Sequence, residues 1–384
     1  MVRWVRFLSL AVIVAGYLWM HFRMGRWLAA LPSVRRSPAR RFGLWLFVGT
    51  MGALLCLGLL LGLSPVARAV QPALWPAWVR AASFTWALLS FVSGCAVWLW
   101  RHTPDFDPQR RRLLRVAGGA ALAAPVAATG FGMFVERGNL RVSEVDIPLR
   151  GLPRDLDGLR LAQLTDIHIG PFLSEKELAR AVDMANELRP HLALVTGDFI
   201  TSLGDPLDAC LYQLGRLKAE AGVLGCLGNH EGYAGVESYT TRQSARRGIR
   251  ILRHASVRLR FGRAALNLAG VDYQSFFEPY LRGAGAMVRK DSLNVLLSHN
   301  PDVFPVAARH GFDLTIAGHT HGGQVNFEIF RQSINVARFY TPYTYGLYRH
   351  GRAAAYVNRG IGTVGIPARI GAPPEIALIR LCAT

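Results

Sequence analysis

Long apolar runs that lack Asp, Glu, Lys and Arg dominate the first 135 residues of this chain. There are four such runs: Phe7–Phe22, Phe42–Ala67, Ala81–Trp100 and Val116–Val135. At a rise of about 1.5 Å per residue, about 20 helical residues cross a hydrocarbon core of roughly 30 Å. The last three runs reach this length, and the first reaches it if Trp4 and Val5 join it. The pattern therefore predicts four transmembrane helices.

The arginines between the apolar runs predict how these helices are oriented. The alternative to a first transmembrane helix is a cleaved signal peptide, which would need small residues directly after the first run. Arg23 and Arg26 lie there instead. Short loops rich in Lys and Arg stay in the cytoplasm. Arginines gather in the loops after the first and third runs, whereas the loop after the second run has only Arg68 before Arg80. With four spans, we expect the N-terminus and everything beyond about residue 136 outside the cytoplasm.

One group of arginines allows a second interpretation. Residues 110–115 have the sequence Arg-Arg-Arg-Leu-Leu-Arg and precede an apolar stretch, which is similar to a twin-arginine export signal. This group is internal, and it lacks the Ser or Thr that usually precedes such a signal. The alternative is a cytoplasmic anchor of the fourth helix. Both interpretations place the residues that follow outside the cytoplasm.

A different pattern begins near Arg141, where short apolar runs alternate with turns. Leu159–Leu164 and Leu192–Thr196 are typical of buried strands. Between them, Ser174 and Glu177 form a capping box ahead of a helix that ends at Pro190. Such a β-α-β unit implies parallel pairing of the two strands. Further strands are expected at Leu266–Val271, Leu293–Leu297, Leu314–Ala317, Ala353–Val357 and Ile376–Leu381.

The two patterns predict a transmembrane module over residues 1–135, a linker and first strand over 136–157, and an α/β domain over 158–384. The whole chain is 51% hydrophobic, with a mean hydropathy of +0.22 and a net charge of +19. Residues 1–135 carry 15 Arg against Asp105 and Asp107, a net charge of +13, and all nine Trp lie between Trp4 and Trp100. A nucleic-acid-binding protein would not segregate its charge in this way, so no nucleic-acid partner is expected.

Polar clusters follow five apolar runs at the point where each run ends. In chain order they are Asp166-Ile-His168, Gly197-Asp198, Gly228-Asn229-His230-Glu231, Ser298-His299 and Gly318-His319-Thr-His321. Asp, Asn and His supply oxygen and imidazole ligands for metal ions. In open α/β sheets, chemistry lies beyond the carboxyl ends of the strands. A single cluster is more often a cap or a turn. Five clusters, each at the end of a strand, favour a metal site.

Together these clusters resemble the signature of the calcineurin-like metallophosphoesterase superfamily, from about residue 158 to 325. With apolar helices in front, and with the tail over residues 358–376, the chain further resembles the bacterial membrane-anchored branch, which includes UDP-diacylglucosamine pyrophosphohydrolases. The resemblance implies two packed mixed β-sheets flanked by helices. It also implies a hydrolase of phosphoric ester or pyrophosphate bonds in the bacterial inner membrane. The predicted spans would make it a multi-pass protein, and the arginines between them predict a catalytic domain outside the cytoplasm.

The resemblance further implies the ligands of a two-metal site. One divalent ion would be bound by Asp166, His168 and His321, the other by Asn229, His299 and His319, with Asp198 bridging both. Two such ions can share a water, acidify it to a hydroxide nucleophile and clamp the phosphoryl oxygens of a substrate. Ligands without thiolate fit Mn, Fe or Zn, and Mn is the usual activator in the family. Mg is a further candidate.

Three residues near these ligands are candidates for contact with substrate. In the family pattern, His230 is not a ligand but protonates the leaving alkoxide or neutralises the developing charge, with its proton influenced by the cations and by Glu231. A structural histidine is the alternative. Arg359 and Arg369 are candidates for binding substrate phosphate, because planar guanidinium suits phosphate oxygens. The alternative for both is a solvated or backbone-bonding arginine.

Two other features bear on the surroundings of the domain. Cys210 and Cys226 are either an extracytoplasmic disulfide or two buried thiols, and we expect thiols because five unevenly spaced Cys form no disulfide framework. Seven arginines between residues 246 and 263 form either a face for anionic lipid or merely a solvated surface.

The expected function is a membrane-bound, dinuclear-metal phosphoester hydrolase whose substrate is a phosphorylated small molecule or lipid of the cell envelope. A narrower alternative is a UDP-diacylglucosamine pyrophosphohydrolase of lipid A biosynthesis. That substrate is made on the cytoplasmic side, which conflicts with the predicted orientation. A non-enzymatic alternative is a metal-stabilised envelope-binding protein. The apolar runs contain no acidic residue, so a transport pathway has little support.

Overall fold

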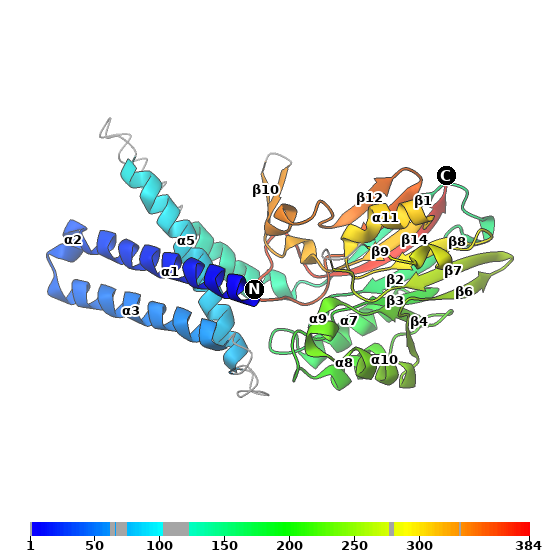
Figure 1. The fold of residues 1–384 in the computed structure, drawn as a ribbon, viewed down its shortest axis with the longest axis horizontal. Coiled ribbons are helices and arrows are strands. Elements are labelled where there is room, and N and C mark those ends of the chain that lie inside the picture. Colours follow the sequence, from blue (N-terminus) through cyan, green and yellow to red (C-terminus); the bar gives the residue numbers. More distant parts are fainter. Residues whose placement is uncertain (1, 62–65, 67–74, 103–122, 276–279, 330–331) are drawn as a thin grey trace. The chain divides into compact units, whose positions relative to one another are not determined.

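The computed structural model describes residues 2–61, 66, 75–102, 123–275, 280–329 and 332–384 (Figure 1). They divide into two compact units, Met1–Phe131 and Gly132–Thr384, which we call the helical unit and the α/β unit. The boundary lies within the last apolar run. The arginines over 110–115 and the first residues of that run, 116–122, lie outside the described residues.

The helical unit contains three long helices that contact one another in pairs. They are α1 (Val2–Ala29), α3 (Pro38–Leu61) and α5 (Trp75–His102), with the short α2 (Pro32–Arg35) between the first two. Residues 123–134 are also helical. Polar side chains lie between the long helices: the Tyr17 hydroxyl donates to the Ala87 carbonyl at 2.9 Å, and His21 Nε2 lies 3.0 Å from the Val48 carbonyl.

Of the helices in the described residues, α3 alone is long and apolar enough to cross a membrane. The predicted runs Phe7–Phe22 and Ala81–Trp100 do lie within α1 and α5. Only part of Val116–Val135 is described. The four-span bundle therefore stays a prediction.

Two six-stranded mixed sheets form the α/β unit. The first has the strand order β1 (Arg141–Leu149), β14 (Glu375–Ala383), β2 (Arg160–Leu164), β3 (Leu192–Thr196), β4 (Val223–Cys226), β5 (Ile249–Ile251). The second has the order β12 (Gly346–His350), β13 (Ala353–Val357), β9 (Leu314–Ala317), β8 (Leu293–Leu297), β7 (Ala264–Gly270), β6 (Ala255–Phe261). Strands β2 to β5 are parallel, as are β13, β9, β8 and β7. A separate antiparallel hairpin pairs β10 (Asn326–Ile329) with β11 (Gln332–Asn335).

The core lies between the two sheets and beneath their helices. Leu161 and Leu194 of the first sheet pack in one fully buried cluster with Leu266, Val295 and Ile316 of the second. A second cluster joins the first sheet to its helices, and a third lies against the second sheet. Because both faces of each central strand are covered, these strands are mostly apolar rather than alternating, and Gln163, Asn267 and Asn294 are buried polar exceptions.

Helices cover the outer faces of the sheets. The α-helices are α7 (Glu175–Glu187), α8 (Leu207–Leu214), α9 (Asn229–Ala234), α10 (Glu237–Arg246) and α11 (Phe304–His310). The 3₁₀ turns are η1 (Glu136–Gly138), η2 (Arg154–Leu156), η3 (Ala284–Met287), η4 (Pro301–Val303), η5 (His321–Gly323) and η6 (Val336–Phe339). The predicted capping box is confirmed: Ser174 Oγ accepts from the Glu177 N–H, and Glu177 accepts from the Ser174 N–H. The predicted pair of mixed sheets flanked by helices is confirmed as well.

Candidate metal centre

Loops from both sheets meet at the carboxyl ends of their parallel strands. The loops after β2, β3 and β4 come from the first sheet, and those after β8 and β9 come from the second. Gln163 of β2 connects the sheets there, because its Nε2 donates to Thr196 Oγ1 at 2.8 Å and to the Ala317 carbonyl at 2.9 Å. The five polar clusters of the sequence are thus carried to a single place in the fold.

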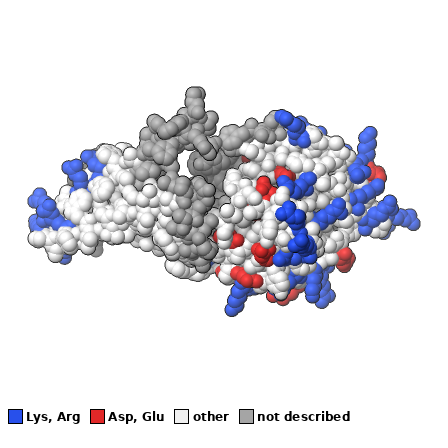
Figure 2. Space-filling view, turned by 60° about the horizontal axis from the view of Figure 1, so that its bottom comes forward, with Lys and Arg blue, Asp and Glu red and all other residues white. Residues whose placement is uncertain are grey.

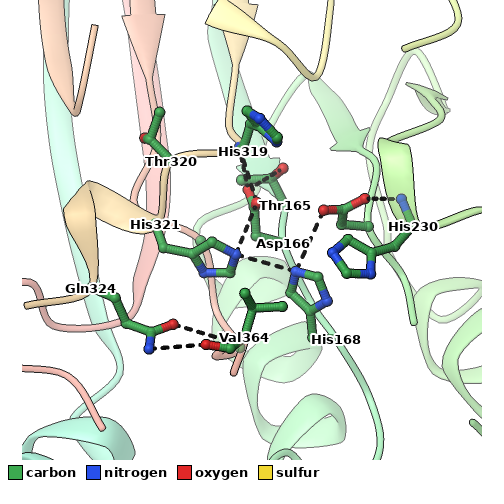
Figure 3. A network of polar contacts seen from close by, with 12 residues as sticks. Thr165, Asp166, His168, His230, His319, Thr320, His321, Gln324 and Val364 are labelled. Atoms are coloured by element: carbon green, nitrogen blue, oxygen red, sulfur yellow. Dashed lines mark hydrogen bonds and ion pairs between the residues drawn. The ribbon is translucent and has the colours of Figure 1, made fainter. Parts of the chain in front are cut away.

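Asp166, His168 and His321 form the first group of possible ligands (Figure 3). Their ligand atoms lie within 4.8 Å of one another, and all three side chains are buried. His321 Nε2 is 3.2 Å from His168 Nε2 and 3.4 Å from Asp166 Oδ1. Thr165 Oγ1 donates to Asp166 Oδ2 at 2.8 Å and orients that carboxylate.

Asp198, His299 and His319 form the second group, again with ligand atoms within 4.8 Å of one another. Asp198 Oδ2 lies 3.0 Å from His299 Nε2 and 3.5 Å from His168 Nε2, so this carboxylate adjoins both groups. Asn229 begins α9 with its side chain buried, and its Oδ1 has no hydrogen-bond partner. Six of the seven predicted ligands are therefore brought together, with Asp198 between the two groups, and Asn229 lies in the adjoining loop with a free acceptor.

The donor set around His299 fits a cation. His299 Nδ1 lies 2.7 Å from the Thr196 carbonyl and therefore donates to it, which leaves a lone pair on Nε2 of the neutral ring. That lone pair faces Asp198 Oδ2 at 3.0 Å, and His299 Nε2 has no hydrogen-bond partner. Two acceptors this close need a proton or a metal ion between them. Burial lowers the pKa of His299, but the carboxylates of Asp198 and Asp166 outweigh it and raise the pKa to about 10.

The other three histidines are held in the neutral form that binds metals. Burial lowers the pKa of His168 and of His319 to about 3 in each case. Burial also brings the pKa of His321 well below its ordinary value, with His168 and Arg369 adding to the effect. Burial raises the pKa of Asp198, but His299 and His168 overcome this and hold it well below its usual range. The centre thus combines neutral imidazoles with an ionised carboxylate, a donor set that suits divalent ions such as Mn, Fe or Zn.

Five of the predicted ligands adopt left-handed backbone conformations. Their φ values are 50° for Asp166, 49° for His168, 54° for Asp198, 76° for His319 and 52° for His321. Asp and His tolerate this region better than most residues, but it still costs free energy and persists only where surrounding structure imposes it. Such strain concentrates at functional sites.

Glycine is required where these loops approach each other. A Cβ on Gly228 would overlap the carboxylate of Asp198, and a Cβ on Gly318 would overlap the side chains of Asp166 and Thr165. The motif glycines therefore allow the ligand loops of different strands to pack together.

His230 lies beside the ligands, and its orientation is fixed (Figure 3). Its ring centroid is 4.7 Å from that of His168. Nδ1 lies 2.6 Å from the Thr201 carbonyl, which can only accept, so Nδ1 carries a hydrogen and Nε2 is left for proton exchange. The backbone N–H of His230 donates to Asp198 Oδ1 at 2.9 Å.

Glu231 has a different role from the one expected. Its carboxylate accepts from the backbone N–H groups of Phe199 at 2.8 Å, Gly228 at 2.8 Å and Asp198 at 3.0 Å. The side chain is fully buried. Glu231 therefore joins the loop after β3 to the loop after β4, and the hydrogen-bond partner of the His230 ring is the Thr201 carbonyl instead.

The two candidate arginines differ from a phosphate-binding pair. Arg369 is 0% exposed, and its guanidinium donates to the carbonyls of Ala372 at 2.9 Å and Gly360 at 3.1 Å, among others. Its assignment to substrate was wrong, because its donors are used by backbone that substrate cannot reach. Arg359 is partly exposed but donates to Glu375 at 2.8 Å, and its role in binding substrate stays a prediction.

The other predicted features are placed as follows. Cys210 and Cys226 are buried and unpaired, as expected. In the basic stretch over 246–263, three arginines face aspartates: Arg247 with Asp208, Arg253 with Asp272 and Arg258 with Asp291. Part of this basic surface is therefore neutralised within the protein. Figure 2 shows acidic side chains interspersed among the basic ones on one face of the α/β unit.

Sequence reasoning missed two neighbours of the centre. Thr201 acts through its carbonyl on His230, and its Oγ1 lies 3.1 Å from His168 Nδ1. Tyr273 follows β7, and its ring centroid is 5.4 Å from that of His319. A backbone carbonyl leaves no signal in a sequence, and a lone tyrosine after a strand is not distinctive.

Comparison with known proteins agrees with this geometry. The family model described as calcineurin-like phosphoesterase matches residues 159–323. An uncharacterized metallophosphoesterase of Helicobacter pylori is 32% identical over 72% of this chain and 74% of its own length. One from Bacillus subtilis is 28% identical over 72% of this chain and 98% of its own length. A zebrafish (Danio rerio) "transmembrane protein with metallophosphoesterase domain" is 36% identical over 63% of this chain and 57% of its own length.

The chain belongs to the calcineurin-like metallophosphoesterase family. It is a hydrolase that acts on phosphoester bonds.

Proposed function

We propose that this chain is a membrane-bound phosphoester hydrolase that uses two divalent ions and acts on a phosphorylated, lipid-linked or envelope substrate. The observation that carries the proposal is the position of Asp198. Its carboxylate adjoins both groups of ligand atoms, and His230 lies next to it. This arrangement provides for two ions that share one ligand, with a proton-transfer group alongside.

The residues of the chain have separate tasks in this reaction. Two divalent ions bound here would supply Lewis acidity to the phosphoryl oxygens and lower the pKa of a water. Asp198 holds the two ligand groups in register. His230 presents Nε2 toward the leaving group because Nδ1 is committed to the Thr201 carbonyl. Since the His230 N–H also binds Asp198, the proton-transfer group is fixed relative to the shared ligand.

Attachment to a membrane is supported by the packing of the helical unit. Large apolar side chains point outward from α3 and α5, with Phe42 71%, Leu46 59% and Phe91 53% exposed. Polar contacts such as that of His21 lie between the helices instead. Apolar surface outside and small or polar contacts inside are typical of helices packed in lipid. Relatives from zebrafish and cattle are named transmembrane proteins. The arginines around the apolar runs further support a multi-pass inner-membrane protein with its α/β unit outside the cytoplasm.

The experiment that tests the reaction uses bis-p-nitrophenyl phosphate with added Mn. We expect His230→Ala to lower kcat by about 10² to 10⁴, the contribution typical of a general acid or base. Tyr212→Ala is the matched control, because Tyr212 is 60% exposed on α8 and should leave kcat unchanged. Unchanged hydrolysis by both His230→Ala and Asp198→Asn would reject the proposed reaction.

A further inference from the structure

Large aromatic side chains are exposed at two places in the α/β unit. Phe134 is 83% exposed at the end of the helix over 123–134. Phe339 is 85% exposed in η6, and the adjacent Tyr340 is 83% exposed. Exposed apolar groups that gather on one side of a soluble domain mark interaction sites.

Residues 368–371 connect the two places. On one side, the Arg369 N–H donates to the Gly132 carbonyl at 3.1 Å, and the Gly371 N–H donates to Glu136 at 3.1 Å. On the other side, the Asn326 N–H donates to the Ile370 carbonyl at 2.7 Å. The segment that enters the α/β unit and the base of the β10–β11 hairpin therefore flank the same short stretch.

The hairpin leads directly to η6 and its aromatic residues. Asn335, the last residue of β11, accepts from the Arg338 N–H at 3.0 Å and so caps η6. Its Nδ2 also lies 3.4 Å from Asn326 Oδ1 at the start of the hairpin. Figure 1 shows the hairpin standing out from the two main sheets. Phe339 and Tyr340 are thus anchored at the base of a projecting element.

The same side of the unit carries part of the metal centre. The 3₁₀ turn η6 contacts η5, which begins with the ligand His321. Arg369, within the connecting stretch, has its Nη2 3.4 Å from His321 Nδ1. Arg338, beside Phe339, is exposed and adds a positive charge. Aromatic side chains next to arginine suit the interface of a bilayer that contains anionic lipid.

We propose that Phe134, Phe339 and Tyr340 form a docking surface that inserts into the interface of a lipid bilayer and holds the metal centre against it. This inference rests on the proposed membrane attachment, because the apolar run 116–135 ends at Phe134 and Val135. A residue at that point emerges where the chain leaves the bilayer. The docking surface thereby lets the phosphorylated headgroup of a lipid reach the metal centre while the acyl chains of that lipid stay in the membrane.

Spin-label depth measurements on the full chain in nanodiscs of phosphatidylcholine and phosphatidylglycerol test the docking surface. A nitroxide is attached at Phe339→Cys after Cys56, Cys95 and Cys382 are replaced by Ser. The control label is at Tyr212→Cys on α8, far from the hairpin in the α/β unit (Figure 1). We expect the label at 339 to be reached by oxygen and shielded from a water-soluble Ni chelate, and the label at 212 to show the reverse. Equal exposure of both labels to the Ni chelate would overturn the proposal.

Hydrolysis of two substrates gives an independent test. The double variant Phe339→Ser/Tyr340→Ser should fold normally, because both side chains are exposed. We expect its activity on hexadecyl p-nitrophenyl phosphate in vesicles to fall at least about tenfold. The reason is that serine has no aromatic surface to transfer from water into the bilayer. Its activity on soluble bis-p-nitrophenyl phosphate should not change. A loss that is equal for both substrates, or absent for both, would count against the docking surface. If the unmodified chain hydrolyses neither substrate, the proposed reaction fails, while the label depths still decide the docking surface.

Discussion

Single atoms of the metal centre are placed where they repel each other unless a positive charge lies between them. The clearest case is His299 Nε2, which faces Asp198 Oδ2 at 3.0 Å while Nδ1 donates to Thr196. Burial lowers the pKa of His299, but the nearby carboxylates outweigh burial and raise that pKa to about 10, whereas burial lowers the pKa of His168 to about 3. The four histidines of the centre are therefore not equivalent as ligands.

This difference predicts which residue loses a proton when metal binds. At neutral pH His299 is protonated, because its pKa is raised, and Nε2 must lose its proton before it can bind an ion. His168 and His319 are already neutral, because their pKa values are lowered. We expect proton release from His299 and an affinity that rises with pH until about 10. Calorimetric titration of metal-stripped protein with Mn, in two buffers of different ionisation enthalpy, measures this. A binding enthalpy independent of the buffer would contradict it.

Glu231 offers a second prediction at this scale. Glu231→Ala removes the acceptor of three buried N–H groups, each of which costs about 1 to 3 kcal/mol when left unpaired. We expect a large fall in the melting temperature of the α/β unit and weaker Mn binding, with a smaller effect for Glu231→Gln, which keeps one acceptor oxygen. Glu220→Gln, at an exposed position, serves as the control. If Glu231→Ala melts like the unmodified chain, Glu231 does not join the loops.

Among the elements, the turns after the strands decide whether the ligands meet. Gly228→Ala places a Cβ against the Asp198 carboxylate and should displace it. Because a misplacement of about 1 Å in a catalytic group can cost about a hundredfold in rate, we expect a loss of that order in kcat. The control is Gly138→Ala, whose Cβ meets nothing within 4 Å. Circular dichroism checks the fold of both variants, and a Gly228→Ala enzyme with normal kcat would contradict the packing argument.

The elements also show what a sequence can predict. The strand Leu192–Thr196 and the helix after Ser174 were predicted correctly, because apolar runs and capping boxes are local signals. The helix α10 was not predicted, since its buried face uses Thr240 and Ser244 rather than apolar residues.

The candidate site was predictable to a similar extent. The motif residues lie together in the structure because each follows a parallel strand, and the carboxyl ends of these strands meet where the two sheets pack together. The environment of Arg369 was not predictable, since its partners are carbonyls from other loops. Contacts between distant backbone groups leave no pattern along the chain.

The molecule as a whole joins an arginine-rich helical unit to a metallophosphoesterase unit. The net charge of +13 over residues 1–135 then reflects topology, because the arginines lie in loops expected to stay in the cytoplasm. We expect a fusion of alkaline phosphatase after Thr384 to be active and a fusion of green fluorescent protein there to be dark, as for a C-terminus outside the cytoplasm. If the green fluorescent protein fusion is fluorescent and the alkaline phosphatase fusion is inactive, the C-terminus lies in the cytoplasm and the predicted orientation is wrong. That result would also revive the nucleotide-lipid substrate.

The central claim is that two ions sharing Asp198 hydrolyse a phosphoester. The most direct measurement titrates metal-stripped protein with Mn and follows bis-p-nitrophenyl phosphate hydrolysis against the number of ions bound per chain. We predict that activity appears as the second ion binds, and that Asp198→Asn neither holds two ions nor gains activity. Full activity with one ion bound, or with Asp198→Asn, would contradict the account.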